Sequence, residues 1–179
     1  MITTHKTTSL QNSLLSARLH DPFSYLGVHR EKGRTLVRVF RPHDVNVWIR
    51  TTIGYEPMSR IHANGIFEWR GEFPPEMPYR LRIEAKGDTQ SVYETYDAYA
   101  FPLQISDHDV YLFNEGKLRQ AYRMLGAQRV RNSGVDGVRF SVWAPNAGRV
   151  SVVGDFNRWD GRIHPMAVHH ASGVWELFI

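Results

Sequence analysis

Short apolar segments alternate with turn-forming residues along most of the chain, and this pattern predicts a β-rich fold. Strands are expected where apolar side chains recur at every second position, or in short runs bounded by Gly, Pro or Asp. These strands are predicted at residues 36–40, 45–49, 65–70, 79–85, 138–143, 149–153 and 174–179.

The amino-terminal segment instead shows helical spacing. Residues 1–8 are polar and are expected to be frayed. From Ser9 to His20, four leucines fall near one helical face, and Ser9 is available as the N-cap. Asp21-Pro22 is expected to end this helix, because the residue before a proline avoids the α conformation.

A second helical stripe covers residues 107–125, with Asp107 as the expected cap. Gly116 lies in its middle and weakens it, so the segment forms either one helix or two short ones.

The second half of the chain repeats the first. VRVFRP, ending at Pro42, aligns with FSVWAP, ending at Pro145, and three further pairs follow in consistent order. These pairs are Leu26-Gly27 with Leu125-Gly126, Val45-Asn46-Val47 with Val150-Ser151-Val152, and GIFEW (65–69) with GVWEL (173–177). Together they indicate two copies of one β-sandwich unit.

We therefore expect an all-β protein of two tandem immunoglobulin-like β-sandwich modules with short connecting helices. The expected divisions are an N-terminal polar segment and short helix at 1–20, a first sandwich at 21–105, a helical linker at 106–128 and a second sandwich at 129–179. The first copy continues after GIFEW with a further turn and strand, whereas the second stops at Ile179. The second module is thus expected to be truncated, ending in mid-strand.

Composition excludes several functional classes. The net charge of +4 is spread over single Lys and Arg residues, so no nucleic-acid footprint is expected. The chain has no cysteine for a disulfide or thiolate site, and the adjacent His169 and His170 point to opposite strand faces, so neither metal nor cofactor is expected. No segment approaches the roughly 20 apolar residues of a membrane span, and we expect a cytoplasmic monomer without membrane contact.

Several motifs carry a family resemblance. They are DPFSYLGVH (21–29), DVYLFNEG (109–116), YRMLGAQ (122–128), the block at 137–166 and GVWELFI (173–179). They resemble the amino-terminal region of bacterial 1,4-α-glucan (glycogen) branching enzymes, over nearly the whole chain from about Ser16 onward. The second half alone resembles carbohydrate-binding module family 48.

This resemblance implies a parent enzyme that transfers α-1,4-glucan chains to 6-hydroxyls on a separate catalytic barrel. The catalytic residues belong to that barrel, so none is assigned to this chain, which is expected to be inactive alone. Its expected partners are α-glucan and the barrel of the parent enzyme. Two alternatives are a free-standing α-glucan-binding module that targets a partner protein, and a sandwich used only for protein contacts.

The loop GDFNRWDG (154–161) holds the candidate site. Trp159 follows polar residues, and no strand pattern draws it inward. A flat aromatic ring can stack on the apolar face of a pyranose, while Asn157 and Asp160 supply groups for its hydroxyls. The resemblance agrees, because the matching Trp is a sugar platform in related modules. The alternative is that Trp159 folds back to close the loop.

The other tryptophans are given structural roles. Trp143 and its counterpart Phe40 are expected on an outer strand face that packs against a neighbouring module. Trp175 is expected in the core, and Trp48 and Trp69 are also interpreted as structural.

Overall fold

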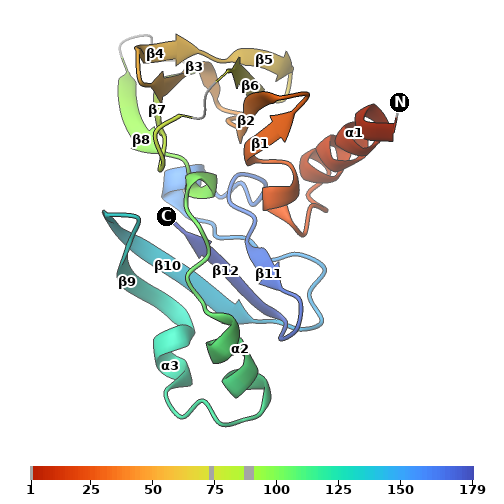
Figure 1. Ribbon diagram of the computed structural model, residues 1–179, viewed down its shortest axis with the longest axis vertical. Helices are drawn as coiled ribbons and strands as arrows, with labels where there is room; N and C mark the ends of the chain where they lie inside the picture. The colour runs from red at the N-terminus through yellow and green to blue at the C-terminus, as the bar shows by residue number, and fades with distance from the viewer. Residues whose placement is uncertain (1, 73–74, 87–90) are drawn as a thin grey trace. The chain divides into compact units, whose positions relative to one another are not determined.

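The computed structural model describes residues 2–72, 75–86 and 91–179, which divide into two compact units (Figure 1). One unit comprises Tyr25–Phe101, and the other combines Met1–Ser24 with Pro102–Ile179. Most of the regular structure lies in three antiparallel four-stranded sheets, with few and short helices. The predicted all-β class is therefore confirmed.

The unit Tyr25–Phe101 is a sandwich of two sheets. One has the order β1-β2-β6-β5 and the other β4-β3-β7-β8. Val39 and Phe67 of the first sheet, and Ile49 and Leu81 of the second, are almost fully buried, and Trp69 of β6 donates its indole N–H to Glu56 of β4 at 3.2 Å. The elements are β1 (Gly27–Glu31), β2 (Arg34–Phe40), β3 (Asp44–Thr51), β4 (Gly54–Pro57), β5 (Ser59–His62), β6 (Ile66–Gly71), β7 (Arg80–Ala85), β8 (Val92–Tyr96) and η2 (Ala98–Ala100).

The other unit contains one sheet, of order β11-β12-β10-β9, together with the helices. Its elements are α1 (Ile2–Leu15), η1 (Pro22–Ser24), α2 (Asp107–Asn114), α3 (Ala121–Met124), β9 (Gly126–Asn132), β10 (Val135–Trp143), η3 (Asp155–Asn157), β11 (Ala167–His169) and β12 (Val174–Phe178). Ile105, Val110, Met124 and Val174 form a buried cluster between α2, α3 and β12.

The predicted helix boundaries were wrong at the amino terminus. The helix begins at Ile2, so Ser9 lies inside it, and most of the segment expected to be frayed is helical; Met1 lies outside the described residues. Serine and threonine cost only a few tenths of a kcal/mol each in a helix, roughly, so they do not prevent it from forming. It ends at Leu15, before Asp21-Pro22, because Ala17 adopts a left-handed φ of 57°.

The second helical segment divides as the sequence allows. Gly116, with a φ of +67°, separates α2 from α3, and this confirms the alternative of two short helices. The cap is Ser106 and not Asp107: the Ser106 hydroxyl accepts the backbone N–H of Asp109 at 3.1 Å. Asp107 is the first helical residue, where its charge favours the positive end of the helix dipole.

The strand predicted at 149–153 is absent, and only an isolated bridge joins Ser151 to Pro165. The flanking backbone bonds, from Val152 to His164 and from Met166 to Val150, are present at 3.0 and 2.9 Å. These two bonds flank the Ser151–Pro165 pair, and the pairing does not extend beyond it. The other predicted strands are confirmed within a few residues, whereas β1, β4, β5, β8, β9 and β11 were not predicted.

The two units repeat one sheet topology, as the sequence repeat predicts. The orders β1-β2-β6-β5 and β9-β10-β12-β11 correspond strand for strand. Both copies close their first hairpin with two residues of positive φ, Lys32-Gly33 and Ser133-Gly134. Such a turn matches the right-handed twist of its flanking strands.

The repeated proline turns are also closed in the same way. Arg41 donates its backbone N–H to Gly65 at 2.7 Å, and Ala144 donates to Gly173 at 2.9 Å. Both glycines have a positive φ, and an added Cβ would lie 2.4 Å from Pro42 Cα or 2.5 Å from Pro145 Cα. Only glycine fits such a close approach, and this explains why GIFEW and GVWEL both begin with it.

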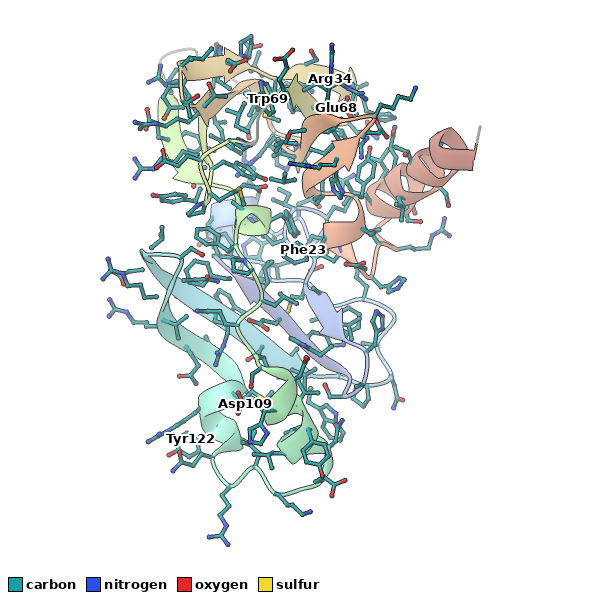
Figure 2. The ribbon with its side chains drawn as sticks, in the orientation of Figure 1. Phe23, Arg34, Glu68, Trp69, Asp109 and Tyr122 are labelled. Atoms are coloured by element: carbon teal, nitrogen blue, oxygen red, sulfur yellow. The ribbon has the colours of Figure 1, made fainter. Side chains whose placement is uncertain are left out.

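A buried glutamate occupies equivalent positions in the two copies. Glu68 in β6 accepts the Nε–H groups of Arg38 and Arg70 at 2.8 and 2.6 Å (Figure 2). Its counterpart Glu176 in β12 is fully buried and accepts the backbone N–H groups of Gln104 and Ile105 at 2.7 and 3.1 Å.

His169 Nε2 lies 2.8 Å from the same Glu176 carboxylate, within hydrogen-bond distance. This carboxylate therefore joins β11 and β12 to the segment that leads into α2. A buried carboxylate is tolerated only when such donors satisfy it.

Glu176→Gln is expected to lower the free energy of unfolding of its unit by about 2–3 kcal/mol, because the amide turns an NH2 group toward backbone donors. Urea denaturation followed by circular dichroism measures the change. Glu115→Gln, at an exposed position next to Lys117, is the control and should change stability by less than about 0.5 kcal/mol. Equal stability of the two variants would contradict this role.

Candidate functional site

The loop 154–161 is held in an unusual backbone conformation. Residues Asp155–Asn157 form a single 3-10 turn, after which Arg158 and Trp159 both adopt left-handed φ angles of 54° and 59°. The backbone N–H of Trp159 returns to the Gly154 carbonyl at 3.0 Å. Left-handed conformations cost about 1 kcal/mol or more per non-glycine residue and concentrate at functional sites.

Trp159 presents its ring to solvent. Its side chain is 66% exposed, and its indole N–H donates to Asp155 Oδ1 at 2.9 Å. This bond ties the edge of the indole to its own loop and leaves the flat face of the ring exposed. The bonds of Trp159 to Gly154 and Asp155 also close the loop, as the alternative expected, so the sugar platform stays a prediction.

Asn157 lies beneath the loop, with only 3% of its surface exposed. Its Oδ1 accepts the backbone N–H of Gly154 at 2.9 Å, and its Nδ2 donates to the Val152 carbonyl at 2.8 Å. The same nitrogen lies 3.0 Å from His164 Nδ1. The amide is thus engaged in holding the loop against the preceding segment.

Asp160 is bound to its neighbour Arg162. The two carboxylate oxygens accept Nε–H and Nη2–H of Arg162 at 2.9 and 2.7 Å, and Oδ1 also accepts its backbone N–H. The Asp160 carboxylate, acting through this hydrogen bond, raises the pKa of Arg162. This fork fixes the carboxyl-terminal end of the loop.

Phe156 is a second exposed aromatic residue in the loop, and sequence reasoning did not select it. It is 61% exposed, and its ring centroid lies 5.6 Å from that of His164. A Cβ at Gly154 would lie 2.6 Å from Phe156 Cε1, so the glycine makes room for this ring. Its position between two polar residues was the available signal.

The remaining tryptophans of this unit differ from Trp159. Trp143 is 55% exposed, but its indole N–H donates to the Ser172 carbonyl and its ring meets Phe113 edge-on at 6.0 Å between centroids. Its counterpart Phe40 is buried. Trp175 is buried and donates to the Ala144 carbonyl at 3.0 Å, which confirms its predicted core position.

Acidic side chains in the loop 154–161 and at the start of α2 are engaged in local hydrogen bonds. No group of three or more His, Cys, Asp or Glu residues in the described part of the chain could hold a metal ion. Asp155 is bonded to Trp159, and Asp109 accepts the Ser106 hydroxyl at 2.8 Å. None of the described helices has the length and apolar character needed to cross a membrane.

Comparison with known proteins gives two family matches. Residues 7–99 match the family described as alpha-1,4-glucan branching enzyme GlgB, N-terminal domain. Residues 124–179, which include the Trp159 loop, match carbohydrate-binding module 48, described as the isoamylase N-terminal domain.

Similar proteins carry the name 1,4-alpha-glucan branching enzyme GlgB. One from Nitrosospira multiformis is 63% identical over 94% of this chain, and one from Nitrosomonas europaea is 61% identical over 96%. A third, from Rubrobacter xylanophilus, is 47% identical over 89%. The chain spans only 22–23% of the length of these relatives. The chain therefore belongs to the GlgB branching-enzyme family, as its N-terminal domain followed by a carbohydrate-binding module 48.

Proposed function

We propose that this chain is the glucan-binding, non-catalytic part of a 1,4-α-glucan branching enzyme, and that Trp159 is the ring on which a glucose unit stacks. The observation that carries the proposal is an exposed indole, locked by Asp155, on a loop with two consecutive left-handed residues. Its position within the carbohydrate-binding module supports the same ligand.

The proposed contact uses the apolar face of a pyranose against the flat indole. Because the ring is already held by its N–H bond to Asp155, little side-chain freedom is lost when the sugar binds. Asn157 and Asp160 support the proposed site by holding its loop. Asn157 bonds the loop to the Val152 carbonyl, and Asp160 bonds its carboxyl-terminal end to Arg162. Phe156 adds a second exposed ring in the same loop.

The chain-transfer chemistry is proposed to belong to the rest of the longer enzyme. A retaining transfer between glucans needs a nucleophilic carboxylate and an acid/base carboxylate about 5 Å apart. Two pairs of nearby carboxylates could be considered for these roles. Asp107 and Asp109 lie at the start of α2. Asp155 and Asp160 lie in the loop 154–161, where each carboxylate is hydrogen-bonded within the loop or to Arg162. The proposed role of the chain is to hold glucan near a catalytic domain that it does not supply.

Trp159→Ala is expected to weaken glycogen binding by roughly tenfold, because the stacking surface is lost. Native-gel retardation with increasing glycogen measures this, and thermal melting should stay unchanged. Tyr122→Ala is the matched control: Tyr122 is also 66% exposed and lies in the same unit, on α3 and outside the loop (Figure 2). If Trp159→Ala and Tyr122→Ala are retarded like the unmodified chain, the platform role is wrong.

Asn157→Ala is expected to weaken glycogen binding and also to lower the free energy of unfolding by about 1–3 kcal/mol. The partly buried N–H of Gly154 and carbonyl of Val152 then lose their partner. Urea denaturation and gel retardation on the same samples test both effects. A variant that keeps full stability would show that the amide does not hold the loop.

The chain alone is expected to form no α-1,6 linkages from amylose. Debranching of the product and chain-length analysis would reveal such linkages. Their appearance above a heat-inactivated control would refute the assignment of the chain as non-catalytic.

A further inference from the structure

The outer face of the sheet β4-β3-β7-β8 is rich in aromatic and arginine side chains. In this sheet, within the unit Tyr25–Phe101, Val47, Ile49, Leu81 and Ile83 point inward and are almost fully buried. Because side chains alternate along a strand, the residues between them face outward. The outward positions are Asn46, Trp48, Arg50, Tyr55, Pro57, Arg80, Arg82, Glu84, Val92, Glu94 and Tyr96.

Strand register arranges these side chains in rows across four neighbouring strands (Figure 1). One row runs Pro57, Trp48, Arg82, Glu94. Beside this row, Tyr55 pairs with Arg50 across β4 and β3, and Arg80 pairs with Tyr96 across β7 and β8. The partly buried Trp48 therefore lies near the centre of a surface made of aromatic rings and guanidinium groups.

Internal contacts hold these planar groups in place. The Arg82 guanidinium carbon lies 4.0 Å from the centroid of the Tyr55 ring, and Nη2 of Arg82 donates to Glu94 at 3.0 Å. The nearby Tyr55 hydroxyl and the hydrogen bond from Arg82 lower the pKa of the Glu94 carboxyl. Arg80 stacks on Tyr96 at 4.9 Å and donates to its hydroxyl at 2.7 Å.

The same face includes an ordered amide and a second carboxylate, because Asn46 donates to Glu84 at 2.8 Å. The charges of three arginines and two glutamates nearly balance on this face. A surface that binds a polyanion instead needs clustered positive charge. Preordered donors, acceptors and rings on a flat surface instead suit a neutral polyol, whose binding then orders few side chains.

We propose that this face is a second α-1,4-glucan-binding surface, with Trp48 as its stacking residue and Arg80, Arg82 and Asn46 as hydrogen-bond donors to hydroxyl groups. The inference rests on the proposed function, in that glucan is the ligand, but it concerns another site in the other unit. Cross-strand arginine–tyrosine pairs also stabilise a sheet, so the test separates binding from stability.

The experiment uses the full chain carrying Trp159→Ala, labelled with nitrogen-15 and titrated with maltoheptaose. The indole N–H resonance of Trp48 and the Nε–H resonances of Arg80 and Arg82 are expected to shift together and to saturate. Adding Trp48→Ala is expected to weaken the remaining binding by about fivefold or more, and Trp48→Phe by less, because a ring is kept.

A charge-matched pair controls for electrostatics. Arg80→Ala removes an arginine from the proposed face, while Arg34→Ala removes an exposed one from β2 in the other sheet of the same unit (Figure 2). Only Arg80→Ala is expected to weaken maltoheptaose binding. Thermal melting of each variant shows whether a loss of binding follows from unfolding, and the resonance shifts decide the case if Trp48→Ala does not fold.

The results separate the two proposals. If the unmodified chain binds maltoheptaose but the Trp48 resonance does not move and Trp48→Ala binds as before, the second surface is wrong and the Trp159 platform is unaffected. If the unmodified chain binds no maltoheptaose or glycogen, both proposals are wrong.

Discussion

One buried carboxylate per copy organises the duplicated sheet. Glu68 and Glu176 occupy equivalent positions, but the first is satisfied by arginine side chains and the second by two backbone N–H groups and His169. Burying an ionised carboxylate away from water is costly unless hydrogen-bond donors surround it, so each copy requires its own set of donors. In the second copy that requirement fixes the segment before α2, and with it the helices beside the sheet.

The two copies differ at the turn that follows the aligned segments Val45-Asn46-Val47 and Val150-Ser151-Val152. In the first copy, β3 turns directly into β4, with Thr51 paired to Gly54. In the second copy this place is taken by the loop 154–161, whose backbone returns on itself and lifts Phe156 and Trp159 into solvent. The same place in the repeat thus forms a regular hairpin of the sheet β4-β3-β7-β8 in one unit and a strained, aromatic loop in the other.

The sequence predicted the sheet strands better than it predicted the segments beside them. Glycines at 65 and 173 mark the repeat because the close backbone approach dictates them. The apolar alternation of VRVF marks β2 as a strand but not its burial, because β2 is buried on both faces from Thr35 to Phe40. The segment 149–153 has a similar apolar alternation but forms only one isolated bridge, from Ser151 to Pro165. Periodicity reports which side chains suit a strand, whereas a strand also needs a neighbour that can donate and accept.

The same reasoning explains why Trp159 was a clearer candidate than its polar neighbours. An exposed indole in a loop has no common structural use, but amide and carboxylate groups near turns frequently satisfy the backbone. Asn157 and Asp160 are engaged in that way, and their bonds hold two successive residues in the left-handed region. The cost of that conformation is offset by Asn157, Asp160 and the Asp155–Trp159 bond, which together hold the loop that exposes the ring.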